Sequence, residues 1–485
     1  MPRVDPPENA GPGETSVGAM TTYDLIVIGA GAVGENVADY AHKRGLTVAV
    51  VEAELVGGEC SYWACMPSKA LLRSSHAVAA AKRLGGAKEA VTGDVDVAAV
   101  LARRNSFTSN WDDASQVQWL ESADIALIRG RATITGEKTI EVDGTAYTAH
   151  AIALVTGSVH TLPPVPGLAE AKPWGTREGT SAQEVPESLL VIGGGVAGSE
   201  LATAWAALGA TVTLAARHGL LGGMEPFAGE LVADGMRELG IDVRTGVNPT
   251  RVDRDEHGLV TTTFDDGTTL VTSEVLAATG RAPGTEHLGL SSVGLTDGEW
   301  LDVDDTMLVT GTDWLYAVGD VNHRALLTHQ GKYQARAAGE VIAARVQGRP
   351  VHAEPWGAHV ATADHAAVPQ VTFTDPEVAS VGLTEEQARQ QGIDVRAVEY
   401  DLGSIAGSAL QADGYTGRAK MVVDESRGVV VGVTFVGQDV AEMLHAATVA
   451  VVGEVPLERL WHAVPAYPTM NEIWLRLLET YGRPE

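Results

Sequence analysis

The chain has 485 residues, with 34 Lys and Arg against 63 Asp and Glu and a formal net charge of −29. This length exceeds one ordinary hydrophobic core, so we expect two to four domains. So acidic a surface disfavours nucleic acid and anionic membranes as partners, and the short, interrupted apolar runs predict no insertion into a membrane.

Residues 1–21 are rich in proline, glycine and acidic residues, and they predict a disordered tail. They lack the basic start and apolar centre of a secretory signal peptide. We therefore expect a cytoplasmic protein, in a reducing compartment where structural disulfides are rare.

Two segments repeat one pattern, Tyr23–Glu52 and Ser188–Ala216. Each is an apolar strand, a GxGxxG loop, an amphipathic helix and a second apolar strand. This is a βαβ unit with a dinucleotide-binding fingerprint. A lone GxGxxG is weak evidence, whereas two in this context predict an α/β protein with two Rossmann-like dinucleotide-binding domains.

The first copy carries Gly29, Gly31 and Gly34. In such loops the glycines permit a tight turn, the approach of a pyrophosphate and close packing of helix on strand. Glu52 ends the second strand, 18 residues after Gly34. An acid at this position binds ribose hydroxyls, so the first site is expected to take an adenosine without a 2′-phosphate.

The second copy differs where the ribose would bind. Ala216 replaces the acid, and Arg217 and His218 follow it. Cations there suit a 2′-phosphate, which favours NADPH over NADH; the alternative for Arg217 is a solvated surface cation. The three glycines of this copy are Gly193, Gly195 and Gly198.

The rest of the sequence predicts helices, then short strands, and then a C-terminal part of a different fold class. Helices are expected over 69–84 and 95–120, and strands over 125–128, 131–134, 139–142 and a run ending at 158. Apolar strands also precede Gly280 and the pair Gly319-Asp320. From about 368 the pattern predicts antiparallel hairpins, with helices over 439–452 and 456–463, and hence a third, α+β domain.

Cys60 and Cys65 are the only cysteines in the sequence, with four residues between them. Two thiols supply half of a zinc site and His76 is outside a usual ligand spacing, so no metal site is expected. A structural disulfide that closes so short a loop constrains the unfolded chain less than one that closes a long loop. Pro67 suits the first turn of a helix, which places Cys65 near the helix N-terminus, and Lys69 follows about one turn on. The helix N-terminus and the lysine both favour a thiolate at Cys65, so the sequence predicts a redox-active pair.

The stretch GGECSYWACMPSK, residues 57–69, resembles GGxCxxxxCxPSK of the class I pyridine nucleotide-disulfide oxidoreductases, which include dihydrolipoamide dehydrogenase, glutathione reductase and mercuric reductase. The resemblance extends from about 23 to 478. It implies that the first glycine loop binds FAD, the second binds NAD(P)H and the third domain is the dimerisation domain of a homodimer. The implied domains are 22–160 with 286–362 for FAD, 161–285 for NAD(P)H, and 363–485 for dimerisation.

The resemblance also implies residue roles. Cys65 is the thiol beside the flavin, Cys60 is the interchange thiol, and Lys69 pairs with Glu200, for which a helix-surface position is the alternative. The remaining implied cofactor contacts are Gly157, Gly280, Gly319 and Asp320. Two aromatic residues between the cysteines either narrow the approach to the disulfide or belong to the core: Tyr62 and Trp63.

The sequence departs from the family near its C-terminus. Family disulfide reductases have HPxxxE, whose His is the base for the interchange thiol in the partner subunit; here Tyr467 holds the His position and Glu472 the Glu position, while His462 is out of register. An unperturbed Tyr, with a pKa of about 10, is a poor base at neutral pH. Losing a general base costs about 10²–10⁴-fold, so lipoamide-type or glutathione-type turnover is expected to be weak.

These features leave three functional hypotheses. The first is an FAD-dependent NAD(P)H oxidoreductase that passes hydride through flavin to Cys60 and Cys65 and then to a small-molecule disulfide, as a dihydrolipoamide dehydrogenase does. The second reduces a quinone or other small oxidant directly from the flavin. The third, a non-catalytic flavoprotein, is disfavoured by the intact cofactor loops. Mercuric reductases share the Tyr and Glu but relay metal through a C-terminal cysteine pair, which this sequence lacks.

Overall fold

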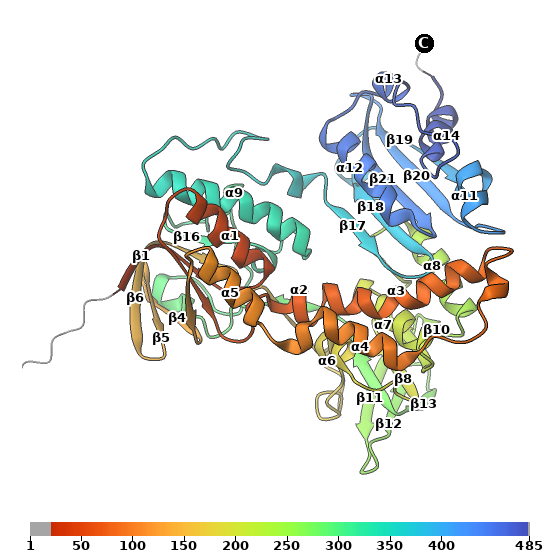
Figure 1. Ribbon diagram of the computed structural model, residues 1–485, viewed down its shortest axis with the longest axis horizontal. Helices are drawn as coiled ribbons and strands as arrows, with labels where there is room; N and C mark the ends of the chain where they lie inside the picture. The colour runs from red at the N-terminus through yellow and green to blue at the C-terminus, as the bar shows by residue number, and fades with distance from the viewer. Residues whose placement is uncertain (1–20, 484–485) are drawn as a thin grey trace, which may run out of the picture.

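The computed structural model describes residues 21–483. The chain forms three lobes, in the order left, lower centre and upper right in Figure 1. Two helices, α3 (Cys65–Lys82) and α4 (Val97–Phe107), extend from the first lobe across the second.

The first lobe is built on a seven-stranded sheet of order β3-β2-β1-β6-β5-β4, with β16 paired to β6. β3, β2, β1, β6 and β16 are parallel, and β5 and β4 form an antiparallel extension. The strands are β1 (Thr21–Ile28), β2 (Val48–Glu52), β3 (Ala126–Arg129), β4 (Ala132–Gly136), β5 (Thr139–Val142), β6 (Thr145–Leu154) and β16 (Leu315–Ala317). The other helices are α1 (Ala32–Lys43), α2 (Gly58–Tyr62), α5 (Ala114–Ser122) and α9 (Thr328–Val346).

Segments far apart in sequence complete this first core. β16 joins the sheet of β1, and α9 packs on α1, with Val37 and Ala41 of α1 in one buried cluster with Ala338 and Ile342 of α9. β16 and α9 thus pack with the N-terminal lobe; the split FAD domain of 22–160 with 286–362 stays a prediction.

The second lobe contains the second glycine loop. Its four-stranded parallel sheet has the order β10-β9-β8-β14, beside a three-stranded antiparallel sheet and a two-stranded pair. The strands are β7 (Ser158–His160), β8 (Ser188–Ile192), β9 (Thr211–Ala216), β10 (Asp242–Thr245), β11 (Pro249–Arg254), β12 (Val260–Phe264), β13 (Thr269–Thr272), β14 (Glu274–Ala277) and β15 (Arg281–Pro283). The helices are α6 (Thr176–Ser181), α7 (Val196–Ala207) and α8 (Pro226–Glu238).

The third lobe is an antiparallel five-stranded sheet of order β17-β18-β21-β20-β19, with helices packed on it. This is the α+β arrangement predicted for the C-terminal part. The strands are β17 (Pro369–Thr372), β18 (Glu377–Gly382), β19 (Val395–Asp401), β20 (Arg418–Asp424) and β21 (Val429–Gly437). The helices are α10 (Glu385–Gln390), α11 (Ala406–Gln411), α12 (Leu444–Val452), α13 (Leu457–Leu460) and α14 (Glu472–Tyr481).

Some predicted bounds were wrong. The helix expected over 95–120 is broken, because Ser109, Asn110 and Trp111 have φ of 50°, 52° and 58°, a left-handed conformation that stops an α-helix. The strand expected to reach 158 ends at Leu154. The helix over 456–463 shrinks to α13, and α14 was not predicted. Of the predicted tail, residues 1–20 lie outside the described residues, and Thr21 opens β1.

The packing of α3 and α4 on the second lobe centres on Trp205 of α7. This residue is fully buried in a cluster with Leu71 and Leu72 of α3, and its indole Nε1 donates to the Gly179 carbonyl at 3.0 Å. α3, whose first residue is Cys65, is therefore held by the neighbouring lobe.

We expect Trp205→Ala to destabilise the protein by about 3–5 kcal/mol, because it deletes a large buried side chain and leaves a cavity. The measurement is the urea midpoint of unfolding. Trp119→Ala, at a side chain 38% exposed on α5, is the matched control and is expected to change stability by less than about 1 kcal/mol. Equal shifts in the two variants would contradict this account.

Candidate active site

The first glycine loop has the shape that a dinucleotide phosphate needs. Gly29 has φ of 101°, and a Cβ on Gly34 would collide with the Gly29 carbonyl. A Cβ on Gly31 would have only the Gly58 Cα nearby, at 3.8 Å. No side chain caps the N-terminus of α1. Its N–H groups are therefore open to an anion such as a pyrophosphate.

The second loop repeats this geometry. Gly193 has φ of 118°, a Cβ on Gly198 would collide with the Gly193 carbonyl, and a Cβ on Gly195 would have nothing within 4 Å. Arg217 and His218 are exposed directly after β9. The structure thus places both cations at the strand end where the ribose of a bound nucleotide is expected.

Two further predicted glycines lie at turns. Gly157 has φ of 68° and no atom within 4 Å of a built Cβ, and Gly280 has φ of 159°. Gly157 joins β6 to β7, and Gly280 precedes β15, which pairs with β7. Both therefore lie where the first and second lobes meet.

Glu52 lies at the end of β2, held by main-chain donors. Its Oε2 accepts from the Ala30 N–H and its Oε1 from the Glu54 N–H, both at 2.8 Å. Burial raises the pKa of Glu52, and these two hydrogen bonds oppose that rise. Burial also raises the pKa of Glu35, on α1, to about 7. Sequence reasoning missed Glu35 because it has no place in the fingerprint.

Two buried polar atoms next to these loops have no partner among the described residues, Glu35 Oε1 and Thr156 Oγ1. Buried polar atoms are normally hydrogen-bonded. Unpaired atoms beside an open glycine loop fit a polar ligand that covers them. The residues present therefore fit the FAD expected from the sequence.

Asp320 lies at the bend after β16 and accepts from the Ser158 hydroxyl at 2.5 Å. Burial raises its pKa, and the Ser158 hydrogen bond opposes the rise. The bend itself is fixed by Gln334 of α9, whose Oε1 accepts from the Gly319 N–H and from Asn322 Nδ2, both at 2.8 Å.

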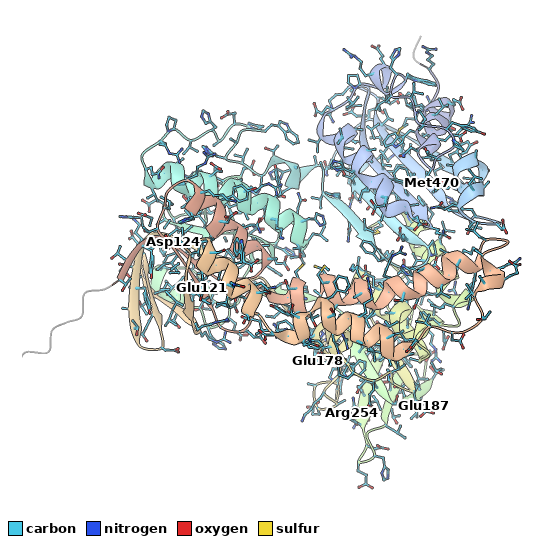
Figure 2. The ribbon with its side chains drawn as sticks, in the orientation of Figure 1. Glu121, Asp124, Glu178, Glu187, Arg254 and Met470 are labelled. Atoms are coloured by element: carbon cyan, nitrogen blue, oxygen red, sulfur yellow. The ribbon has the colours of Figure 1, made fainter. Side chains whose placement is uncertain are left out.

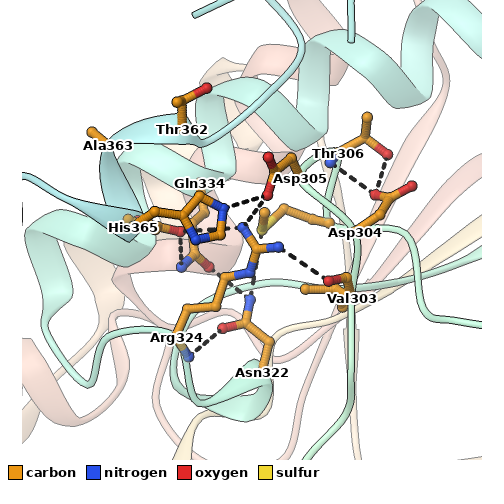
Figure 3. A network of polar contacts seen from close by, with 12 residues as sticks. Val303, Asp304, Asp305, Thr306, Asn322, Arg324, Gln334, Thr362, Ala363 and His365 are labelled. Carbon is orange, nitrogen blue, oxygen red and sulfur yellow. Dashed lines mark hydrogen bonds and ion pairs between the residues drawn. The ribbon is translucent and has the colours of Figure 1, made fainter. Parts of the chain in front are cut away.

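A polar network continues from this bend to the surface (Figure 3). Gln334 Nε2 donates to Asp364 at 2.8 Å, and Arg324 pairs with Asp305 at 2.9 Å, where His365 also binds at 2.7 Å. The network therefore braces the backbone that carries Asp320.

The two cysteines lie on consecutive helices. Cys60 is in α2, Cys65 is the first residue of α3, and both thiols are free. Cys65 Sγ lies 3.2 Å from Thr328 Oγ1. The hydrogen bond from Cys60 is the largest cause that lowers the pKa of Cys65 to about 6; burial opposes it, and Thr328 and the Lys69 charge assist it.

The same hydrogen bond raises the pKa of Cys60, and burial adds to the rise. The pair is therefore asymmetric, with Cys65 the thiolate and Cys60 the proton carrier. Sequence reasoning missed Thr328, because it lies 263 residues from Cys65 at the start of α9 and no motif connects the two.

Lys69 and Glu200 meet as predicted, with Nζ and Oε2 at 2.6 Å. Glu200 is 3% exposed, so the helix-surface alternative was wrong. The other oxygen of Glu200 accepts from the Phe373 N–H at 2.9 Å. One carboxylate of the second lobe thus contacts α3 and the third lobe.

The two aromatic residues between the cysteines, Tyr62 and Trp63, have different surroundings. Tyr62 is 1% exposed and its hydroxyl donates to the Val56 carbonyl at 3.1 Å, so it belongs to the core. Trp63 is half-buried, with the Arg177 guanidinium 4.2 Å above its ring. Trp63 therefore faces the second lobe rather than the interior.

Tyr467 and Glu472 lie in the third lobe. Tyr467 is 77% exposed, whereas Glu472 is buried at the start of α14 and pairs with Arg476 at 2.6 Å. Among residues 21–483 no hydrogen bond joins either of them to the cysteines or joins one to the other. Their assignment as partner-subunit groups stays a prediction. His462 is exposed.

No group of three or more His, Cys, Asp or Glu among the described residues is arranged to hold a metal ion. None of their helices has the length and apolarity required to span a bilayer.

Comparisons with known proteins agree with this geometry. Residues 23–345 match the pyridine nucleotide-disulphide oxidoreductase model, and residues 368–477 match the dimerisation domain of that family. A dihydrolipoyl dehydrogenase from Halobacterium salinarum is 32% identical, covering 95% of this chain and 96% of the relative. A mercuric reductase from Staphylococcus aureus is 31% identical, covering 93% and 81%.

Among solved structures, the HOCl-induced flavoprotein disulfide reductase RclA from Escherichia coli has a TM-score of 0.80 at 24% identity, covering 94% of this chain and 99% of that one. At this identity the likeness shows a shared fold. The family models together span most of the described chain. The chain belongs to the pyridine nucleotide-disulphide oxidoreductase family, whose members depend on FAD and take electrons from NAD(P)H.

Proposed function

We propose that the protein is a homodimeric NADPH oxidoreductase that reduces a small-molecule disulfide through Cys60 and Cys65. The observation that carries this proposal is the placement of the two free thiols, with Cys65 at the start of α3, 3.2 Å from Thr328 Oγ1 and one turn before the Lys69–Glu200 pair. These surroundings lower the pKa of Cys65, whereas the pKa of Cys60 is raised. A pair in which one sulfur is already a thiolate and the other keeps a proton suits stepwise exchange. The free thiols fit a cytoplasmic location.

The proposal assigns residues to each cofactor. The N–H groups of α1 beyond Gly31 would hold the pyrophosphate of FAD, Glu52 its adenosine ribose, and Asp320 its ribityl region. Bound FAD would supply two-electron transfer between the nicotinamide and the Cys60–Cys65 disulfide. The loop of Gly193, Gly195 and Gly198 holds the nicotinamide dinucleotide.

The dithiol then performs the exchange. Cys60 reacts as a thiolate: its proton passes to Cys65 as its sulfur attacks one sulfur of an acceptor R–S–S–R′, forms a mixed disulfide and releases R′S⁻, which then takes that proton from Cys65. Cys65 thiolate attacks the Cys60 sulfur, closes the Cys60–Cys65 disulfide and releases RS⁻. The dithiol loses two electrons and the acceptor gains them.

The acceptor class follows from the missing base. Tyr467 stands at the position of the expected His, so the exchange lacks the imidazole base that the family resemblance places there. Leaving thiols of low pKa depart without that help. We therefore favour acceptors with acidic leaving thiols over dihydrolipoamide-type or glutathione-type disulfides.

A second candidate is direct reduction of a quinone or other small oxidant by the bound flavin. The same Tyr467 favours it, because this route needs no base at Cys60. Mercuric ion is less favoured as an acceptor, because Cys60 and Cys65 are the only thiols in the sequence to receive it.

Anaerobic reduction with NADPH is expected to produce the long-wavelength absorption of a thiolate beside flavin. The thiolate exists above the pKa of Cys65, about 6, and is lost as pH falls through it. Thr328→Val removes a hydrogen bond that lowers this pKa, so the midpoint should move to higher pH, while Thr328→Ser keeps it. No absorption, or absorption that survives Cys65→Ser, would refute the dithiol proposal.

Tyr467→His restores a group of pKa about 6.5 and is expected to raise turnover of lipoamide by about 10²-fold. The measurement is kcat/KM for lipoamide, compared with 5,5′-dithiobis(2-nitrobenzoate), whose acidic leaving thiol should make it less sensitive. Tyr467→Phe is the control and should gain nothing. A His variant without gain would show that something other than the missing base limits this acceptor.

Arg217→Ala is expected to raise KM for NADPH by about 10-fold or more, because it removes a charge-assisted contact to the 2′-phosphate, and to leave KM for NADH nearly unchanged. Arg237→Ala, at an exposed arginine of α8 paired with Asp234, is the control. Equal effects on both nucleotides would argue against 2′-phosphate recognition by Arg217.

A further inference from the structure

The residue before Cys60 is held by two arginines. Glu59 Oε1 accepts from Arg177 Nε at 2.8 Å and its Oε2 from Arg281 Nη2 at 2.7 Å. Burial by itself raises the pKa of Glu59, but Arg281 and Arg177 outweigh it and the pKa lies below its usual value. The carboxylate is therefore charged at neutral pH, and we call these three residues the Glu59 clamp.

Arg177 of the Glu59 clamp belongs to the second lobe. Arg177 is in α6, whose first turn is closed by Glu178, labelled in Figure 2, accepting from the Gly175 N–H at 2.8 Å. Arg177 also binds Glu54 at 2.9 Å and covers the ring of Trp63. The Glu54 contact is made by Nη1, whereas Nε binds Glu59, so the two contacts use different nitrogens of the guanidinium.

The other arm leads to the expected FAD site. Arg281 Nε donates to the Ser158 hydroxyl at 2.5 Å, and that hydroxyl donates to Asp320 at 2.5 Å. Arg281 also donates to the Ser158 carbonyl at 2.6 Å. Contacts thus run without interruption from Asp320 to the residue next to Cys60.

The helix that carries Cys60 needs such support. α2 has five residues, starts after Gly57 at φ of 111°, and has no side-chain cap; so short a helix is unstable alone. Its C-terminal side is held by Thr180 Oγ1 donating to the Trp63 carbonyl at 2.8 Å and by Trp111 Nε1 donating to the Tyr62 carbonyl at 3.1 Å. Its N-terminal side is held by the Glu59 clamp.

We propose that Glu59 is the positioning residue of the interchange thiol: the Glu59 clamp fixes α2 so that Cys60 donates to Cys65 and presents its sulfur to the acceptor. This inference rests on the proposed dithiol function. It separates two routes, because exchange with a disulfide needs the clamp, whereas electron transfer from flavin to a quinone does not.

The test is Glu59→Gln in the FAD-loaded full-length protein. We expect kcat/KM for 5,5′-dithiobis(2-nitrobenzoate) to fall about 10-fold or more, since small misplacement of a reacting group is costly, with menadione turnover and FAD content unchanged. The thiolate absorption should remain, with its midpoint at higher pH, because the hydrogen bond from Cys60 is the main cause of the low pKa of Cys65.

Glu54→Gln is the matched control, because Glu54 also binds Arg177 but lies outside α2; it is expected to change both readouts less than about twofold. Arg177→Gln is the second variant and should reproduce the effect from the other lobe. The double variant Glu59→Gln/Arg177→Gln should be no worse than Glu59→Gln alone, since Glu59→Gln already breaks the contact between Glu59 and Arg177.

The outcomes separate this inference from the proposed function. Unchanged disulfide turnover and an unchanged midpoint in Glu59→Gln and Arg177→Gln, with Cys60→Ser inactive toward disulfides, overturn the Glu59 clamp alone. Equal losses of disulfide and menadione turnover in both variants overturn it as well, because they indicate a general defect. Disulfide turnover that survives Cys60→Ser overturns the proposed function itself.

Discussion

The ion pair between Lys69 and Glu200 is the contact on which the arrangement of the site depends. Glu200 is buried on α7, Lys69 lies one turn into α3, and the Phe373 N–H comes from the third lobe. A buried carboxylate is costly unless charge and hydrogen bonds compensate it. Breaking such a pair leaves an uncompensated charge and costs about 3–5 kcal/mol, so the start of α3, and with it Cys65, has one favourable position.

From that position the protein gives two chemically identical thiols different roles. The N-terminus of α3, Thr328 and the Lys69 charge all act on Cys65, while Cys60 lies on a separate short helix. The hydrogen bond between the sulfurs then lowers one pKa and raises the other. The division of labour within the dithiol is therefore a property of geometry, and it requires both helices to be held from outside.

The parts of this site that follow local rules could be predicted from the sequence. The glycine loops, Glu52 and the pair Cys60–Cys65 each sit in a fixed spacing with a physical reason. The pairing of Lys69 with Glu200 followed from family register. Thr328, Arg177 and Arg281 could not be predicted, because no spacing in the sequence marks them. Thr328 contacts Cys65, and the two arginines contact Glu59 beside Cys60, only after distant strands and helices have packed.

The misjudged bounds have a similar cause. The break between α4 and α5 lies at non-glycine residues in a left-handed conformation, so no glycine or proline marked it. Tyr62 could be assigned to the core only once the Val56 carbonyl was found opposite its hydroxyl. Burial of a polar side chain depends on a partner elsewhere in the chain, which local pattern does not show.

A second polar contact, far from the dithiol, has its own consequence. Lys420 of the third lobe is buried between Glu225 and Glu385, at 2.8 Å and 2.6 Å, and Glu225 belongs to the second lobe at the start of α8. Together with Glu200, it ties these two lobes at two separated points. Two fixed points restrict rotation of one lobe against the other to the line that joins them. Any other relative motion of the second and third lobes has to break a buried ion pair or the Glu200 hydrogen bond to the Phe373 N–H.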